Sequence, residues 1–118
     1  MEEKENRRKN TRSAVWENVT AYVEFDEPHH KKSKIKRTIN GSVRDIGSKG
    51  MFVVSGESLP MNVKAEISID FDSRRPGTLT ISAQGKTVRR SVDGFGIQFT
   101  RINLKRLMEC ITGRMNRS

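Results

Sequence analysis

Short runs of alternating apolar and polar residues, separated by turn-forming residues, constrain the fold of this chain more than any other feature. In the first run, Val19, Ala21, Val23 and Phe25 share one face and polar residues fill the positions between them. This period of two is typical of a half-buried β-strand. Five further runs follow, each bounded by turns containing Gly, Pro, Asn or Asp. The six predicted strands cover residues 19–25, 35–46, 51–55, 63–71, 79–91 and 95–99.

Six short strands joined by turns predict an antiparallel β-barrel, because a closed or nearly closed sheet leaves no exposed edge strands. Gly41 and Gly85 each interrupt a strand, and a glycine in such a place indicates a bulge or sharp bend. The expected fold class is therefore all-β with a C-terminal helix: a six-stranded antiparallel barrel followed by one amphipathic helix.

The helix is predicted from a change of period after the last strand. Asn103 is a plausible N-cap residue. The apolar residues that follow fall on one helical stripe: Leu104, Leu107, Met108, Ile111 and Met115. We expect this stripe to pack over one mouth of the barrel, with Lys105, Arg106 and Glu109 on the opposite face and Cys110 as a packing residue. A helix that binds a partner or a membrane surface would show the same stripe.

The chain of 118 residues suits one domain. Residues 1–12 hold five cations and three acids and no apolar residue after Met1, so we expect a flexible basic arm there. The predicted division is an arm at 1–12, a barrel at 13–102, and the helix with its tail at 103–118.

Charge and cysteine content limit the classes of function. The net charge of +9 favours anionic partners. Cys110 is the single cysteine, which excludes an internal disulfide and a cysteine-rich zinc site. No apolar run is long enough for a membrane span, and no signal-peptide core follows Met1. We therefore expect a cytoplasmic protein with no membrane span.

No catalytic constellation is present, and we expect neither enzyme activity nor a metal or cofactor. The run "QGKT" (84–87) resembles the end of a phosphate-binding loop, but Thr80 stands where that motif needs its first glycine. His29 and His30 are adjacent and flanked by lysines, which disfavours a metal ion.

Two other short motifs occur together in the chain. "RRKNTR" contains R-x-x-x-R at Arg8 and Arg12, preceded by Arg7, and "RDIGSKG" begins its turn at Asp45, 33 residues after Arg12. The pair resembles the signature of PilZ domains, an R-x-x-x-R arm followed by D/N-x-S-x-x-G in a turn between two strands. The later runs "GKTVRR" and "GFGIQF" are also similar to that family.

The resemblance implies a six-stranded barrel with a C-terminal helix and, for many members, binding of the bacterial second messenger cyclic di-GMP. It assigns the ligand to Arg7, Arg8 and Arg12 of the arm and to Asp45, Gly47, Ser48 and Gly50 of the turn. The chemistry is consistent, because the arginine fork matches both phosphate oxygens and guanine O6 and N7. Asp45 would accept hydrogen bonds from guanine N–H groups, and the glycines would allow close backbone approach.

One position departs from the family pattern, because Gly47 stands where the family has serine. A hydroxyl that would bond the ligand is missing, which costs about 0.5–1.5 kcal/mol of binding free energy. Ser48 compensates if the turn shifts by one residue.

Three hypotheses follow from these motifs. The first is a cyclic di-GMP receptor that orders its arginine arm on the ligand and relays the signal to a protein partner not identified by the sequence. The second is a PilZ-like interaction module that has lost nucleotide binding and docks on a motility or polymer-secretion protein. The third is a small basic barrel that binds nucleic acid through the cations of 29–37, which we do not expect because the chain has few aromatic residues for base stacking.

Overall fold

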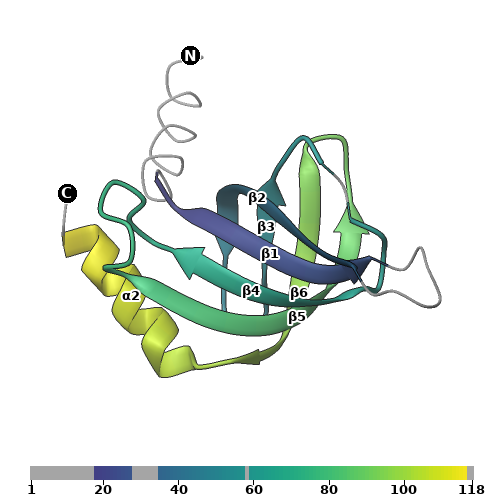
Figure 1. Cartoon of the computed structure of the whole chain (residues 1–118). Coiled ribbons are helices and arrows are strands. Elements are labelled where there is room, and N and C mark those ends of the chain that lie inside the picture. The colour runs from purple at the N-terminus through teal and green to yellow at the C-terminus, as the bar shows by residue number, and fades with distance from the viewer. Residues whose placement is uncertain (1–17, 28–34, 58, 117–118) are drawn as a thin grey trace, which may run out of the picture.

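The computed structural model describes residues 18–27, 35–57 and 59–116. Within these ranges the chain forms a closed antiparallel barrel of six strands in the order β1-β2-β3-β6-β5-β4, followed by one helix (Figure 1). The elements are β1 (Thr20–Glu27), β2 (Ile35–Ile46), β3 (Gly50–Val54), β4 (Lys64–Asp70), β5 (Thr80–Arg90), β6 (Gly94–Ile102) and α2 (Leu104–Asn116). The predicted fold class is confirmed. The predicted arm at 1–12 and the histidines His29 and His30 lie outside the described residues.

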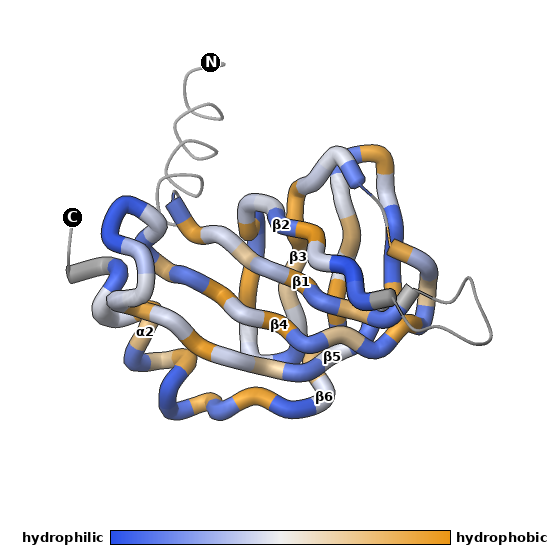
Figure 2. Tube along the Cα trace, viewed as in Figure 1, coloured by the Kyte–Doolittle hydropathy of each residue, from blue (hydrophilic) through white to orange (hydrophobic). Residues whose placement is uncertain are grey.

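The core consists of the apolar side chains that alternation places on the inner face of each strand. Figure 2 shows the alternation as hydrophobic and hydrophilic segments that succeed one another along the strands. Burying these side chains is the main driving force for closing the sheet. Fully buried side chains in the barrel include Val23, Ile39, Val53, Ile69, Phe71 and Phe95.

The last strand is longer than predicted, because the sequence pattern ended it at Phe99 and β6 continues to Ile102. The register between β5 and β6 shifts beside Gly85, which pairs with Phe99, whereas Gln84 pairs with Arg101. Thr100 is thus an extra residue, and Phe99 and Ile102 both pack against the core although they are three positions apart. The bulge breaks the period of two and hides the end of the strand.

The two predicted irregularities have different outcomes. The bend expected at Gly85 coincides with the register shift between β5 and β6. Gly41, however, pairs regularly with Ala21, and the irregularity of β2 lies between Val43 and Asp45. Gly41 instead allows close packing, because a Cβ atom there would collide with the carbonyl oxygen of Val54.

Helix α2 begins as predicted. The backbone N–H of Arg106 donates to Oδ1 of Asn103 over 3.0 Å, so Asn103 is the N-cap. The predicted stripe is confirmed in part, because Leu107 is buried and Ile111 packs against the core. Leu104 and Met108 are exposed instead, and the buried face also carries Cys110 and Arg114. The side chain of Met115 lies outside the described part.

Contacts with the start of β5 explain this orientation of the helix. The guanidinium of Arg106, which was predicted to face away, donates to the carbonyl oxygen of Thr80 from Nε (3.1 Å) and Nη2 (3.0 Å). A Cβ atom on Gly113 would lie 3.1 Å from Leu79, so the helix approaches β5 closely at this point. Cys110 is fully buried, and burial raises the pKa of its thiol. Its interpretation as a packing residue is confirmed.

The side chain of Thr87 on β5 anchors the segment that precedes β4. This side chain is fully buried. The hydroxyl donates to the carbonyl oxygen of Pro60 (2.6 Å) and accepts from the N–H of Val63 (3.1 Å). One hydroxyl therefore satisfies two backbone groups of the segment that leads into β4.

Replacing Thr87 with valine should lower the free energy of unfolding by about 1–3 kcal/mol, because the shape is kept while two backbone partners are lost. Urea denaturation measures the change. Thr38→Val on the exposed face of β2 is the control and should change stability by less than about 0.5 kcal/mol. Equal effects of the two substitutions would show that the hydroxyl has no such role.

Candidate functional site

The predicted motif forms the turn between β2 and β3. Asp45 and Ile46 end β2, and the N–H of Gly47 donates to the carbonyl oxygen of Gly50 over 2.9 Å, which closes the turn. Ser48 and Lys49 are exposed at its tip. The motif "RDIGSKG" thus places Asp45 and Gly50 on neighbouring strands, at the two ends of a short connection.

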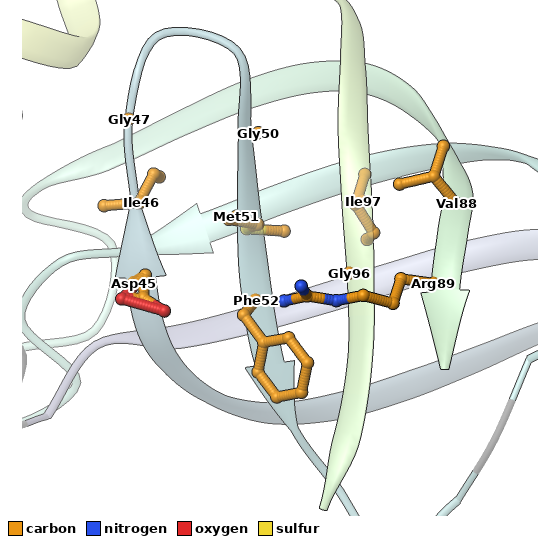
Figure 3. Close-up of a pocket in the computed structure, with 10 residues that line it drawn as sticks. All are labelled: Asp45, Ile46, Gly47, Gly50, Met51, Phe52, Val88, Arg89, Gly96 and Ile97. Atoms are coloured by element: carbon orange, nitrogen blue, oxygen red, sulfur yellow. The ribbon is translucent and has the colours of Figure 1, made fainter. Parts of the chain in front are cut away.

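An open depression of about 420 Å³ lies beside this turn, on the outer face of the barrel (Figure 3). Its lining contains Asp45, Gly47 and Gly50 of the predicted site, together with residues of β3, β5 and β6. Ser48 is not among the lining residues. The depression therefore brings three of the four predicted turn residues into one concave surface.

Missing side chains create the depression. Gly50 on β3 and Gly96 on β6 line the depression, and Gly94 lies two residues before Gly96 on the same strand. A Cβ atom on Gly50 would collide with the carbonyl oxygen of Ile97, and one on Gly94 with that of Val53. The glycines let the two strands approach closely and leave the outer surface between their neighbours unfilled.

A row of paired residues crosses four strands at the bottom of the depression. Asp45 on β2 pairs with Phe52 on β3, Phe52 pairs with Gly96 on β6, and Gly96 pairs with Arg89 on β5. Figure 3 shows the Arg89 side chain extending from β5 past Gly96 toward Phe52. The carboxylate of the predicted motif and a cation from "GKTVRR" therefore lie on the two sides of one aromatic ring.

Two bulges turn the charged members of this row outward. Along β2 the register passes from Val43–Val53 to Asp45–Phe52, so Arg44 is the extra residue. Along β5 it passes from Thr87–Ile97 to Arg89–Gly96. Strict alternation from the buried residues Val43 and Thr87 would send Asp45 and Arg89 into the core. The bulges place both on the outer surface instead.

Phe52 is unusual because it faces outward yet is only 3% exposed. Its neighbours Met51 and Val53 belong to the core, whereas Phe52 does not. Two guanidinium groups cover the ring, with the Cζ atoms of Arg44 and Arg89 at 4.0 Å and 5.4 Å from its centroid. These are cation–π distances.

The electrostatics of the two cations differ. Nη1 of Arg44 lies 3.6 Å from Oδ2 of Asp93, and its Nε lies 3.9 Å from Oδ2 of Asp45. Arg89 has no ion pair within the described residues. The side chain of Asp45 is 67% exposed, so its carboxylate is accessible to a ligand. The site thus offers both an acceptor and a cation whose charge is not neutralised by a carboxylate.

The structure places only part of the predicted site. Arg7, Arg8 and Arg12 lie outside the described residues. Sequence reasoning assigned no role to Arg44, Phe52 and Arg89. The "GKTVRR" similarity pointed to the strand that carries Arg89, but the bulges that orient these side chains leave no clear signal in the sequence. No cluster of potential metal ligands occurs in the described part of the chain.

The described chain is thus a small antiparallel β-barrel domain with a D-x-G-S-x-G turn beside an open depression. The PilZ domain family model matches residues 6–113, so the chain belongs to the PilZ domain family. Many domains of this family are cyclic di-GMP receptors, and they act as ligand-binding adaptors rather than enzymes. No curated protein and no solved structure gives a significant match. Within the described ranges, no helix has the length and apolar character required to cross a membrane.

The two glycines of the turn should respond differently to substitution by serine. No atom lies within 4 Å of a Cβ placed on Gly47, and its backbone is not left-handed. Gly47→Ser should therefore change the free energy of unfolding by less than about 0.5 kcal/mol. Gly50→Ser should lower it by about 1–3 kcal/mol, because β3 must move away from β6. Thermal denaturation of both variants tests the difference, and equal stabilities would contradict it.

Proposed function

We propose that this chain is a receptor for cyclic di-GMP that orders its N-terminal arginine arm on the ligand and presents the altered surface to a protein partner. The observation that carries the proposal is the depression, which gathers Asp45, Gly47 and Gly50 of the motif with Arg89. The family match supports it, because residues 6–113 include both the arginine arm and the turn.

The turn supplies the acceptor side of the site. Guanine offers two N–H donors on one edge, and the exposed carboxylate of Asp45 accepts both. Gly50 keeps the neighbouring surface free of side-chain atoms, so the base approaches the backbone closely. Arg89, on the far side of Phe52, offers a cation to a ligand phosphate.

The arm supplies the second half of the site. Arg7, Arg8 and Arg12 provide three planar forks for a ligand with two phosphates and two guanines. Arginine bonds phosphate oxygens in bidentate fashion and also stacks on a base, whereas lysine offers phosphate a point charge and has no planar group to stack. Ordering the arm over the depression costs conformational entropy, which lowers the net affinity. Because the arm is ordered only on the ligand, binding also changes the surface of the domain.

Gly47 favours a second candidate, a PilZ interaction module that does not bind the nucleotide. The missing hydroxyl removes one donor to the ligand, and exposed Ser48 is not among the residues that line the depression. Binding to a partner without the ligand, at unchanged affinity when cyclic di-GMP is added, would favour this candidate.

Nucleic-acid binding receives less support. A single strand needs exposed aromatic side chains on which bases stack. Among the described residues, Phe25, Phe71 and Phe95 are buried in the core, and Phe52 is covered. Of the cationic segment 29–37, Arg37 forms an ion pair with Glu57 at 2.8 Å.

Alanine at Arg8 or Arg12 should weaken cyclic di-GMP binding by about 100-fold or more, because each substitution removes a charge-assisted bidentate contact. Isothermal titration calorimetry at physiological salt, with GTP as the control ligand, measures the affinity and the stoichiometry. Lys9→Ala is the matched variant, since it removes the same charge from the same segment, and it should bind within about threefold of the parent. Saturable binding that GTP does not reproduce establishes the receptor, and unchanged affinity in both arginine variants excludes the arm.

Gly47→Ser should raise the affinity for cyclic di-GMP by up to about tenfold, because it restores a hydroxyl at an open position of the turn. Gly47→Ala is the control, as it adds the Cβ without the hydroxyl and should leave the affinity near that of the parent. If serine and alanine act alike, the hydroxyl is not the missing contact.

A further inference from the structure

The strongest observation that the motifs do not explain is the pair formed by Arg44 and Phe52. We propose that the guanidinium of Arg44, held on the Phe52 ring, is the surface on which a guanine base of the ligand stacks while Asp45 reads the edge of the same base. This inference rests on the proposed function and assigns it one further binding residue, Arg44, and one positioning residue, Phe52.

The bulge in β2 makes this arrangement possible. Successive residues of a regular strand point to opposite faces, so a residue next to Asp45 would normally point into the core. Because Arg44 is the extra residue of the bulge, both Arg44 and Asp45 lie on the outer surface. A flat cation and a carboxylate acceptor therefore stand side by side on consecutive residues. A base that contacts the first has its donor edge near the second.

Three groups hold Arg44 in place. Its Cζ atom lies over the Phe52 ring at 4.0 Å, which is van der Waals contact with the face of the ring. Asp93, in the turn between β5 and β6, holds Nη1 at 3.6 Å, and Asp45 lies 3.9 Å from Nε. An arginine fixed before binding loses less rotamer freedom when the ligand arrives, so these contacts preorganise it.

Arg44 is also accessible. Its side chain is 48% exposed, although the side toward Phe52 is covered. The remaining side faces solvent, next to the exposed carboxylate of Asp45. Guanidinium groups stack readily on flat aromatic systems, and guanine provides such a face.

Phe52 is then a positioning residue for Arg44. An outward strand position next to solvent normally carries a polar side chain, and an aromatic residue there needs a cover. Arg44 and Arg89 provide that cover from two sides. Two like charges on one ring repel each other, and an anionic ligand that contacts both relieves that repulsion. The arrangement is suited to a ligand that combines a base with a phosphate.

Calorimetric titration of the full chain with cyclic di-GMP tests the proposal. Arg44→Ala should lower the affinity at least tenfold. Arg44→Lys keeps the charge but not the planar group, and should lose most of the same affinity. Phe52→Leu should give an intermediate loss of about fivefold, since Arg44 keeps its contacts with Asp45 and Asp93 but no longer lies on an aromatic ring. Arg101→Ala is the matched control, because it removes an exposed cation from β6 outside the depression, and it should bind within twofold of the parent.

The outcomes separate this inference from the proposed function. If the parent binds and Arg44→Ala binds equally well, the stacking role is wrong and the receptor stands. If Arg44→Lys matches the parent while alanine does not, Arg44 acts only through its charge and stacking is again overturned. Absence of binding by the parent itself overturns the receptor and this inference together. The midpoint of urea unfolding for each variant identifies any loss that comes from misfolding. The lysine variant, which retains the side-chain stem, keeps the test decisive if the alanine variant unfolds.

Discussion

The close approach of β3 and β6 is the constraint on which both the fold and the site depend. Gly50 and Gly94 each place a backbone where a Cβ would collide with a carbonyl oxygen of the opposite strand. This contact lets six short strands close around one core, and it also leaves a stretch of outer surface without side chains. The absence of a Cβ atom at Gly50 therefore serves closure of the barrel and also forms part of the depression beside the turn.

The sequence was sufficient to predict the fold because each strand buries one face. The run from Val19 to Phe25 and the run from Val63 to Phe71 alternate without interruption, and both form strands of the barrel. The prediction was wrong at positions where packing between elements determines the local structure. The end of β6 was missed because the extra residue Thr100 shifts the period of two. Helix α2 is rotated because Arg106 donates to the carbonyl oxygen of Thr80 and because Gly113 leaves room for the side chain of Leu79.

The candidate site was predictable only in its motif. Asp45 and Gly50 could be found because their spacing is a family signature, and the family match covers them. The sequence did not reveal the roles of Arg44, Phe52 and Arg89. A period of two applied to β2 and β5 places Asp45 and Arg89 in the core. Two register shifts reverse both orientations. Whether a bulge forms depends on the partner strand. In the sequence of β2 and β5 it is visible only as a polar residue at a position where alternation predicts an apolar one.

Closure of the barrel also determines how another protein can recognise this domain. Every described strand has a hydrogen-bonded neighbour on both sides, although β2 pairs with β3 only from Ser42 onward. Along the rest of the barrel a partner cannot extend the sheet by adding a strand of its own, which is a common and largely sequence-independent way to bind. Recognition there proceeds through side chains, as on the outer face of α2, where Leu104 and Met108 are exposed. Contacts of that kind are selective for sequence, so a partner can distinguish this domain from others of the same fold.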